Sequence, residues 1–329
     1  MLNLLLLTLW TSARPSMVRR DGIPDYVLTY APHTQLCSTD PYAPSDIATH
    51  VAHVIPEIDY VPVNNDTVTI ETLSSYSSDV YLTSKDNPAS SPAWMLSDFN
   101  LPDSSGYSTA PATIILADKG NGVLDAFYFL FYSFNRGSTF VDIVFGDHVG
   151  DWEHVMVRFI NETPAYIYLS EHTGGSAYTY DTLPTNNSRA ITYVANGTHA
   201  NYATVGVHPY EYGLVYDTTN QGPFWDVTQN YRGFWFDVQS ETFTSAGGAS
   251  IGGQEQYEEG ASWLSWLGYW GDEQYPLSDP RQFCILGECT WESGPTGPYS
   301  KNLNRTAVCE DEDDCTILTS IDCDYDFCF

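Results

Sequence analysis

The chain has 329 residues, enough for one large domain or two modest ones with a well-buried core. Its 42 acidic residues against 12 Lys and Arg give a net charge of −30, and such a field repels nucleic acid and anionic membranes while attracting cations. Aromatic residues make up 15% of the chain, which indicates a globular protein and excludes a disordered one. We expect no nucleic-acid partner, and the oligomeric state stays open.

The first residues predict entry into the secretory pathway. Residues 1–13 hold a short apolar run followed by small residues, a pattern typical of a signal peptide and too short to span a bilayer. The pair Arg19-Arg20 follows, so residues 14–20 are predicted to be a propeptide that ends in a dibasic site. No later stretch is long and apolar enough for a transmembrane helix. The expected location is the extracellular space or the vacuole lumen.

Glycosylation sequons and cysteines agree with that location. Asn-x-Ser/Thr sequons occur at Asn65, Asn161, Asn186, Asn196 and Asn304. Six of the seven cysteines lie after residue 283, and in an oxidising compartment they predict disulfides: Cys284, Cys289, Cys309, Cys315, Cys323 and Cys328. A zinc site is the competing interpretation, but no Cys-x2-Cys pair occurs. Cys37 either reaches these cysteines or stays buried and free.

In the first third of the chain the sequence predicts one helix among strands and loops. Residues 25–30 are strand-like. Ser45 is a good N-cap for a helix with apolar residues at positions 47, 51 and 54, and Pro56 would end it. Residues 61–110 are rich in Ser, Asn, Asp and Pro and are interpreted as a loop-rich insertion with one strand near 67–73.

From residue 113 onward, short β-branched or aromatic segments separated by Gly, Pro or Asn predict a series of strands. They cover 113–117, 124–134, 153–159, 166–170, 190–194 and 213–216. This spacing favours a mainly β fold, an antiparallel β-sandwich or twisted sheets with a few short helices and long loops. After the strands we expect a mobile loop at 241–260, a short helix or packed loop at 262–270, and an acidic, disulfide-tied, solvated tail at 309–329.

The densest polar cluster runs from Gly146 to Val155. His148, Asp151 and Glu153 stand at H-x2-D-x-E, with Asp147 beside them and glycines that let the chain turn sharply. Mostly oxygen ligands favour Mg²⁺, Ca²⁺ or Mn²⁺ over zinc, so these four residues form a candidate divalent-cation site. The alternative is a buried hydrogen-bonded network that only stabilises the fold.

Further polar residues lie where predicted strands end, in two segments that each place a histidine beside glycines. If adjacent strands end on one side, one cleft could hold the candidate ligand-binding residues His154, Glu171, His172, His199 and Asn201. Any single histidine among them is more often a satisfied structural residue than a ligand. A glycan on Asn196 would crowd this cleft beside His199.

With these residues in view, the chain resembles the vacuolar protein sorting-associated protein 62 family. The segments that carry the resemblance are Tyr30–Pro32, Tyr42–Ile47, Asp125–Phe129, Phe131–Asn135, Gly146–Val155, Gly197–Tyr202, Asp217–Asp226, Trp270–Pro276 and Gly294–Leu303. The resemblance implies one family domain over about 25–308 and a role in delivering proteins to the vacuole. It implies no settled biochemical activity.

A shorter resemblance is to the necrosis- and ethylene-inducing peptide-like proteins, whose heptapeptide is Gly-His-Arg-His-Asp-Trp-Glu. His148, Asp151, Trp152 and Glu153 fall at matching offsets, but Gly150 stands where that motif has its second His. In those toxins the motif binds a divalent cation in a β-sandwich that recognises membrane sphingolipid sugars. An upstream Asp also binds the cation there, and Asp142 and Asn135 are candidates for that position.

Three hypotheses for function follow. The first is a divalent-cation-dependent module that binds a glycan or a lipid headgroup. The second is a hydrolase of a polysaccharide or phosphodiester in which Asp151 or Glu153 acts as base on a metal-bound water. The third is a non-catalytic structural or trafficking factor whose central motif stabilises the fold. The sequence leans away from an enzyme without excluding one.

Overall fold

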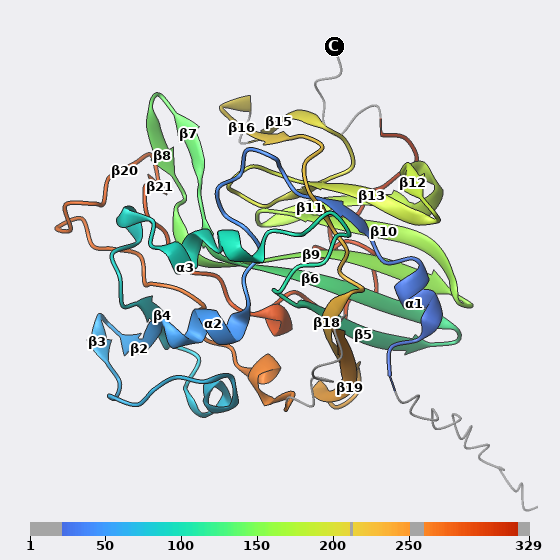
Figure 1. Ribbon diagram of the computed structural model, residues 1–329, viewed down its shortest axis with the longest axis horizontal. Helices are drawn as coiled ribbons and strands as arrows, with labels where there is room; N and C mark the ends of the chain where they lie inside the picture. Colours follow the sequence, from blue (N-terminus) through green and yellow to red (C-terminus); the bar gives the residue numbers. More distant parts are fainter. Residues whose placement is uncertain (1–21, 211–212, 251–259, 322–329) are drawn as a thin grey trace, which may run out of the picture.

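The computed structural model describes residues 22–210, 213–250 and 260–321 (Figure 1). The predicted signal peptide, the predicted propeptide, Cys323 and Cys328 lie outside these residues. Within the described ranges, no helix has both the length and the apolar character needed to cross a membrane.

An eight-stranded sheet forms the centre of the fold, in the order β19-β18-β5-β6-β9-β10-β11-β22. Its strands are β5 (Ala112–Gly120), β6 (Val123–Asn135), β9 (His148–Ile160), β10 (Thr163–Glu171), β11 (Gly174–Thr179), β18 (Asn230–Asp237), β19 (Thr242–Ser250) and β22 (Ile317–Leu318). The long pair β6 and β9 is antiparallel and buried over nearly its whole length, because both faces of the sheet are covered and near-continuous apolar runs suit such strands.

A smaller sheet packs on one face of the large one. It contains β1 (His33–Gln35), β12 (Thr185–Asn186), β13 (Arg189–Val194), β14 (Asn201–Tyr202) and β17 (Phe224–Trp225). In β13 every second residue is buried, and Ala190 and Val194 meet Tyr128 and Val155 of the large sheet in one apolar cluster, called here core 2. The predicted β-sandwich is therefore confirmed. Its pairing is not purely antiparallel, since β1–β13, β5–β18 and β11–β22 are parallel.

The opposite face of the large sheet is covered by short helices and loops rather than by a second sheet. α2 (Ile47–Ala52), α3 (Ala93–Leu96), η1 (Ile70–Ser75) and η6 (Ser262–Ser265) contribute to this layer, called here core 1. Trp152 of β9 lies 5.2 Å from Trp270 and 6.1 Å from Trp263 between ring centroids. Large aromatic side chains supply much of the buried area in such a loop-built layer.

The remaining short elements connect these layers. They are α1 (Asp25–Thr29), β2 (Val54–Ile58), β3 (Val61–Pro62), β4 (Tyr81–Ser84), η2 (Pro88–Ser90), η3 (Asp98–Asn100), β7 (Ser138–Phe140), β8 (Ile143–Phe145), η4 (Tyr180–Thr182), β15 (Gly206–Tyr210), β16 (Val215–Thr219), β20 (Cys284–Ile285), β21 (Glu288–Cys289) and η7 (Pro298–Ser300). Residues 61–110, expected to be a loop-rich insertion, place Leu73, Leu82 and Met95 in core 1 with no exposed surface.

Three predictions for the first third of the chain are wrong in detail. Residues 25–29 form a helix and not a strand: Pro24 is its N-cap, the carbonyl of Pro24 accepts the backbone N–H of Val27, and the helix buries Val27 in core 2. The helix near 47 is capped by Asp46 and not Ser45, and it ends before Val54 and Pro56, which belong to β2. The segment near 67–73 becomes the 3₁₀ helix η1.

The predicted strands from residue 113 onward are confirmed, with longer bounds for β9 and β10. The strand predicted at 213–216 begins at Val215 instead. Residues 242–250, predicted as part of a mobile loop, form β19 because they pair with β18 at the sheet edge. The segment 262–270 is a short 3₁₀ helix followed by a packed loop, as predicted.

Four of the cysteines predicted to form disulfides pair in the described residues, as Cys284–Cys289 and Cys309–Cys315, and Cys37 is buried and free. The second disulfide lies in the segment 302–318, which packs onto the large sheet: Cys309 belongs to core 1 and Ile317 pairs with Ala177. This part of the expected solvated tail therefore belongs to the fold.

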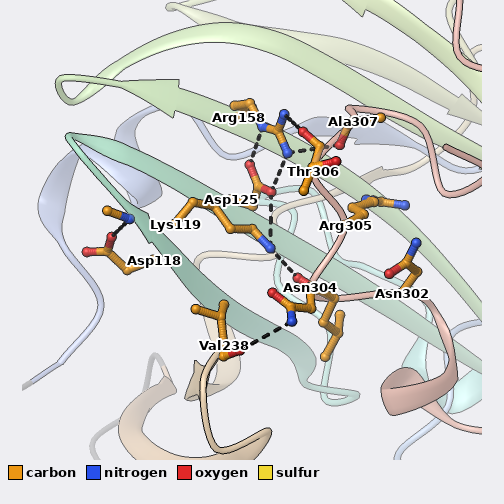
Figure 2. A network of polar contacts seen from close by, with 12 residues as sticks. Asp118, Lys119, Asp125, Arg158, Val238, Asn302, Asn304, Arg305, Thr306 and Ala307 are labelled. Atoms are coloured by element: carbon orange, nitrogen blue, oxygen red, sulfur yellow. Dashed lines mark hydrogen bonds and ion pairs between the residues drawn. The ribbon is translucent and has the colours of Figure 1, made fainter.

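A buried ionic network fastens that segment to the large sheet (Figure 2). Asp125 is fully buried and accepts two hydrogen bonds from Arg158, at 2.7 and 2.8 Å. Arg158 also donates to the carbonyls of Thr306 and Ala307, and Lys119 donates to that of Leu303. Basic side chains of the sheet thus satisfy backbone carbonyls that pair with no strand.

The five sequon asparagines all lie on the surface. Asn65, Asn161, Asn186, Asn196 and Asn304 are each exposed. Accessibility is necessary for a glycan but does not show one, so glycosylation stays a prediction.

Candidate functional site

The central motif lies on β9 itself and not on a loop, and Gly150 breaks the regular alternation of that strand. Gly150 has φ +70°, and Val149 and Trp152 both belong to core 1 although they are three residues apart. A strictly regular strand would send them to opposite faces. This irregularity brings His148 into electrostatic range of Asp151, as the glycine spacing predicts.

Beyond Gly150, regular pairing sorts the side chains of β9 between the two faces. Glu153 pairs with Leu130, and Val155 pairs with Tyr128, both members of core 2. His154 pairs with Phe129 of core 1 and lies 5.0 Å from its ring. Directly opposed residues share a face, so Glu153 points toward core 2 and His154 points away from it. His154 therefore does not join the candidate site predicted around Glu153.

His199 is the centre of a fully buried polar arrangement on the core 2 side. Its Nδ1 donates to Asp151 Oδ2 at 2.8 Å, and its ring stacks on Tyr132 with centroids 3.6 Å apart. Its Nε2 lies 3.5 Å from an oxygen of Asp40 and has no hydrogen-bond partner. Burial raises the pKa of Asp40, against the charge of His199 and the backbone N–H groups of Gly197 and Tyr42, which lower it.

Glu153 lies where β9 and β10 separate. The ladder between these strands ends at Val155 and Leu169, and Ser170 Oγ then accepts the backbone N–H of His154 at 2.8 Å and donates to Glu153. Burial first, and then the charge of Asp151, raise the pKa of Glu153 well above its usual range. A carboxyl with this environment is a candidate functional group.

Asn201 completes the arrangement. It is fully buried on β14, which packs against β9 and β10, and neither its Oδ1 nor its Nδ2 has a hydrogen-bond partner. The hydroxyl of Tyr132 is also buried and unpartnered. Buried polar atoms without partners are costly and uncommon in folded proteins. We call the set Asp40, Tyr132, His148, Asp151, Glu153, His199 and Asn201 the buried polar cluster.

The hydrogen bond and the burial of His148 favour the neutral imidazole with a free lone pair. Its Nδ1 lies 2.7 Å from the carbonyl of Gly150, and since a carbonyl can only accept, Nδ1 carries the proton and Nε2 keeps a lone pair. Burial lowers the pKa of His148. Asp147 has other partners, the backbone N–H of Gly137 at 2.9 Å and Arg136 at 3.8 Å.

A second His–Asp pair lies beside the cluster. His172, in the turn after β10, bonds Asp217 of β16 at 2.8 Å, and Asp217 also accepts from Thr198 and Tyr202. Burial lowers the pKa of His172, but the hydrogen bond and charge of Asp217 outweigh it and raise that pKa overall. Burial raises the pKa of Asp217, and its hydrogen bonds and the charge of His172 outweigh this and lower it.

This pair predicts a pH-dependent contribution to stability. A raised histidine pKa stabilises fully below 6.5 and is lost as pH rises through the folded value, whereas a lowered aspartate pKa stabilises above 3.8 and is lost as pH falls. We therefore expect the loss of unfolding free energy in His172→Gln to be largest near pH 5 and to shrink by pH 8. Urea unfolding of both proteins at these two pH values tests this, and a loss that grows toward pH 8 would contradict it.

The predicted site residues thus divide into two groups. Asp151 bonds His199 and interacts electrostatically with His148, Glu153 and His172, and Asn201 lies on β14, which contacts β9. His154 lies on the other face of the sheet, beside Arg305. Glu171 is buried at the end of β10, where its charge helps raise the pKa of His172. Asn135 donates to the carbonyl of Gly146, and Asp142 is exposed in the β7–β8 turn.

Asp40, Tyr132 and Asp217 were not predicted from the sequence as site residues. Asp40 and Tyr132 belong to segments whose patterns predict only a loop and a buried strand. Asp217 follows a predicted strand and begins a segment that resembles the family, and these two features together could have identified it as a candidate site residue. Across the described residues, no three or more His, Cys, Asp or Glu side chains form a group that could hold a metal ion.

Comparisons with known proteins place the chain among relatives. The family model described as vacuolar protein sorting-associated protein 62 matches residues 115–233. Vacuolar protein sorting-associated protein 62 of Saccharomyces cerevisiae is 32% identical over 91% of this chain and 70% of its own length. TDA6 of the same yeast, provisionally named a vacuolar protein sorting-associated protein, is 35% identical over 87% of this chain and 68% of its own length.

Among solved structures the likeness is weaker. Necrosis and Ethylene inducing Protein 2 from the causal agent of cocoa's Witches Broom disease has a TM-score of 0.30 and 12% identity over 56% of this chain and 69% of that chain. NLPPya, solved in complex with glucosamine, has the same TM-score and identity over 68% of this chain and 74% of that chain. Scores this low carry no argument about function. The identity and coverage of the two yeast relatives show the family: the chain belongs to the vacuolar protein sorting-associated protein 62 family.

Proposed function

We propose that the protein is a binding module in which the buried polar cluster takes a divalent cation, and that this cation bridges oxygens of a glycan or a lipid headgroup. The observation that carries the proposal is the unpaired state of Asn201 on β14, a strand that contacts β9, where Asp151 and Glu153 lie. Both polar atoms of its side chain are buried without partners.

The charge balance supports a cation. The side chains of Asp40, Asp151 and Glu153 are all buried, and His199 is the one histidine hydrogen-bonded or ion-paired with any of them in the described residues. Burying carboxylates is costly unless a counter-charge or several hydrogen bonds compensate. Repulsion between carboxylates also acts on Glu153, because the charge of Asp151 contributes to raising its pKa. A divalent cation would remove this repulsion.

The donor set suits a hard cation held incompletely by the protein. The carboxylates of Asp151 and Glu153 and the amide oxygen of Asn201 are the oxygen donors that Mg²⁺, Ca²⁺ and Mn²⁺ prefer. Since no three acidic, histidine or cysteine side chains gather as a ready ligand set in the described residues, oxygens of the bound glycan or headgroup would complete the coordination. Ligand binding would then depend on the cation.

The first test is calorimetric titration of Mg²⁺, Ca²⁺ and Mn²⁺ into metal-stripped protein. We expect binding of at least one of these ions, weakened about tenfold or more, or about 1.4 kcal/mol, in Asp151→Asn and Glu153→Gln. Circular dichroism establishes that both variants keep the fold. Glycan arrays and liposomes, each with and without the ion, then distinguish the two classes of ligand.

Asp147→Asn is the matched control, because this neighbouring carboxylate bonds Gly137 and lies close to Arg136 instead. It should leave cation affinity within about twofold of wild type. Absence of cation binding in the wild-type protein would contradict the proposal, and so would an equal loss in Asp147→Asn.

Two other functions use the same residues and are separated by simple measurements. A metal-dependent hydrolase would turn over a polysaccharide or phosphodiester when loaded with the cation and would lose turnover in Glu153→Gln. A structural or trafficking factor would keep ligand binding in Glu153→Ala and lose only stability.

We further propose that the protein works within the secretory pathway, outside the cell or in the vacuole lumen, and that it takes part in vacuolar protein delivery. Two disulfides, five exposed sequons and membership of the family support this location. Fractionation of cells expressing the full chain, with endoglycosidase treatment, tests it. A cytosolic, unglycosylated protein would contradict the location.

A further inference from the structure

A second candidate binding site lies in a surface hollow built by other elements than the buried polar cluster. The hollow has a volume of about 370 Å³ and lies between the β2–β3 turn, the start of β4 and the loop after η6. β2, β3 and β4 lie together at the lower left of Figure 1. A volume in this range suits a ligand about the size of a sugar ring or an amino-acid side chain.

Two stacked tyrosines form one wall of the hollow. The rings of Tyr81 and Tyr269 are parallel within 7°, with centroids 4.2 Å apart, and both side chains are half-buried. Backbone hydrogen bonds hold them in place: Leu82 N donates to Tyr269 O and Tyr269 N donates to Val80 O, each at 2.9 Å. The aromatic wall is therefore built into the fold and does not depend on a ligand.

Carboxylates form the opposite side. Asp59, Asp79 and Glu273 line the hollow with Ser78, and none of the three carboxylates forms an ion pair within the described ranges. Oε2 of Glu273 is buried and has no hydrogen-bond partner. Burial first, and then the charges of Asp59 and Glu57, raise the pKa of Glu273. The hollow therefore carries negative charge that nothing in the described chain neutralises.

The lining suits an organic cation better than a metal ion. The faces of the tyrosine rings offer a metal ion no ligand atoms, and the lining contains no histidine or cysteine. Aromatic rings beside carboxylates instead recognise an organic ammonium group, which the ring faces attract by cation–π interaction and the carboxylates attract by charge.

We propose that this hollow binds an organic ammonium group, with the tyrosine stack and the carboxylates of Asp59, Asp79 and Glu273 as its recognition elements. The group could be carried by an amino sugar or by the lysine side chain of a basic segment, and both share the chemistry that the hollow recognises. The site is independent of the cation proposed for the buried polar cluster, so either proposal can fail without the other.

The test uses pairs of probes that differ only in the ammonium group, titrated into metal-stripped full-length protein at pH 6 and followed by NMR chemical shifts. Glucosamine is compared with glucose, and Nα-acetyl-lysine amide with Nα-acetyl-norleucine amide. We expect the ammonium member of at least one pair to bind at least about fivefold more tightly than its neutral partner. The pair with the larger ratio identifies the source of the group.

Glu273→Gln and Asp79→Asn should each lower that affinity at least about threefold, because each removes one charge without changing side-chain size. Asp66→Asn, an exposed acidic residue outside the hollow, is the control and should leave affinity unchanged. Equal binding of charged and neutral probes, binding of none of the probes, or an equal loss in Asp66→Asn would each overturn the proposal.

Discussion

Gly150→Ala is expected to lower the free energy of unfolding by about 3 kcal/mol or more. Gly150 has φ +70°, where an L side chain is strained, and a Cβ atom there would lie 2.3 Å from the carbonyl oxygen of Trp270. That oxygen also binds His50 at 2.9 Å, so it is fixed and cannot move aside without loss. Chemical unfolding followed by tryptophan fluorescence measures the effect.

Gly120→Ala separates backbone strain from this collision. Gly120 has a similar φ of +78°, but nothing lies within 4 Å of the position that its Cβ would take. Its expected loss is about 1 kcal/mol, from strain alone. Equal losses in the two variants would mean that the close contact between β9 and the Trp270 loop contributes nothing beyond the backbone strain.

Asp125→Ala is expected to lower the free energy of unfolding by about 3–5 kcal/mol, because it leaves Arg158 and Lys119 without their buried partner. Asp125 is fully buried, bonds Arg158 through both oxygens and lies 3.8 Å from Lys119. Burial lowers the pKa of Lys119 to about 8 even with that carboxylate present. Figure 2 shows that the same side chains hold the segment around Thr306. Urea unfolding monitored by circular dichroism gives the value.

Two further variants identify the cause. Asp118→Ala removes a neighbouring carboxylate that accepts only the backbone N–H of Gly120, and it should cost about 1 kcal/mol. The double variant Asp125→Leu with Arg158→Met should recover part of the loss, since Arg158 is then no longer left as an unpaired charge, although Lys119 still lacks its partner. A double variant as unstable as Asp125→Ala would mean that Arg158 contributes through its bonds to Thr306 and Ala307 instead.

The strands of the large sheet could be predicted because their residues determine their own conformation. β5, β6 and β9 are apolar, β-branched or aromatic over many residues, and glycine and asparagine mark their ends. Such segments form strands in almost any context that buries both faces. The short segment Asp25–Thr29 carries the same residue types, yet it folds as a helix because its position after Pro24 and its contact with core 2 decide the conformation.

The candidate site could be predicted only in part, and for a related reason. The motif around His148, Asp151 and Glu153 is contiguous and visible in the sequence. Asp40 and His199, however, reach Asp151 through the packing of the small sheet on the large one. Spacing along the chain does not encode such contacts. The position of His154 on the other face follows from the two-residue period of β9, and this alternation could be predicted from the sequence alone.

Anomalous diffraction from crystals of the metal-stripped protein soaked in Mn²⁺ tests the central claim most directly. We predict one strong peak within bonding distance of the carboxylates of Asp151 and Glu153 and the amide oxygen of Asn201, absent in crystals of Glu153→Gln. Clear density for these side chains without a peak between them, at Mn²⁺ concentrations that saturate binding in solution, would contradict it. The buried polar cluster would then be a structural network, and the cation-dependent function would fall with it.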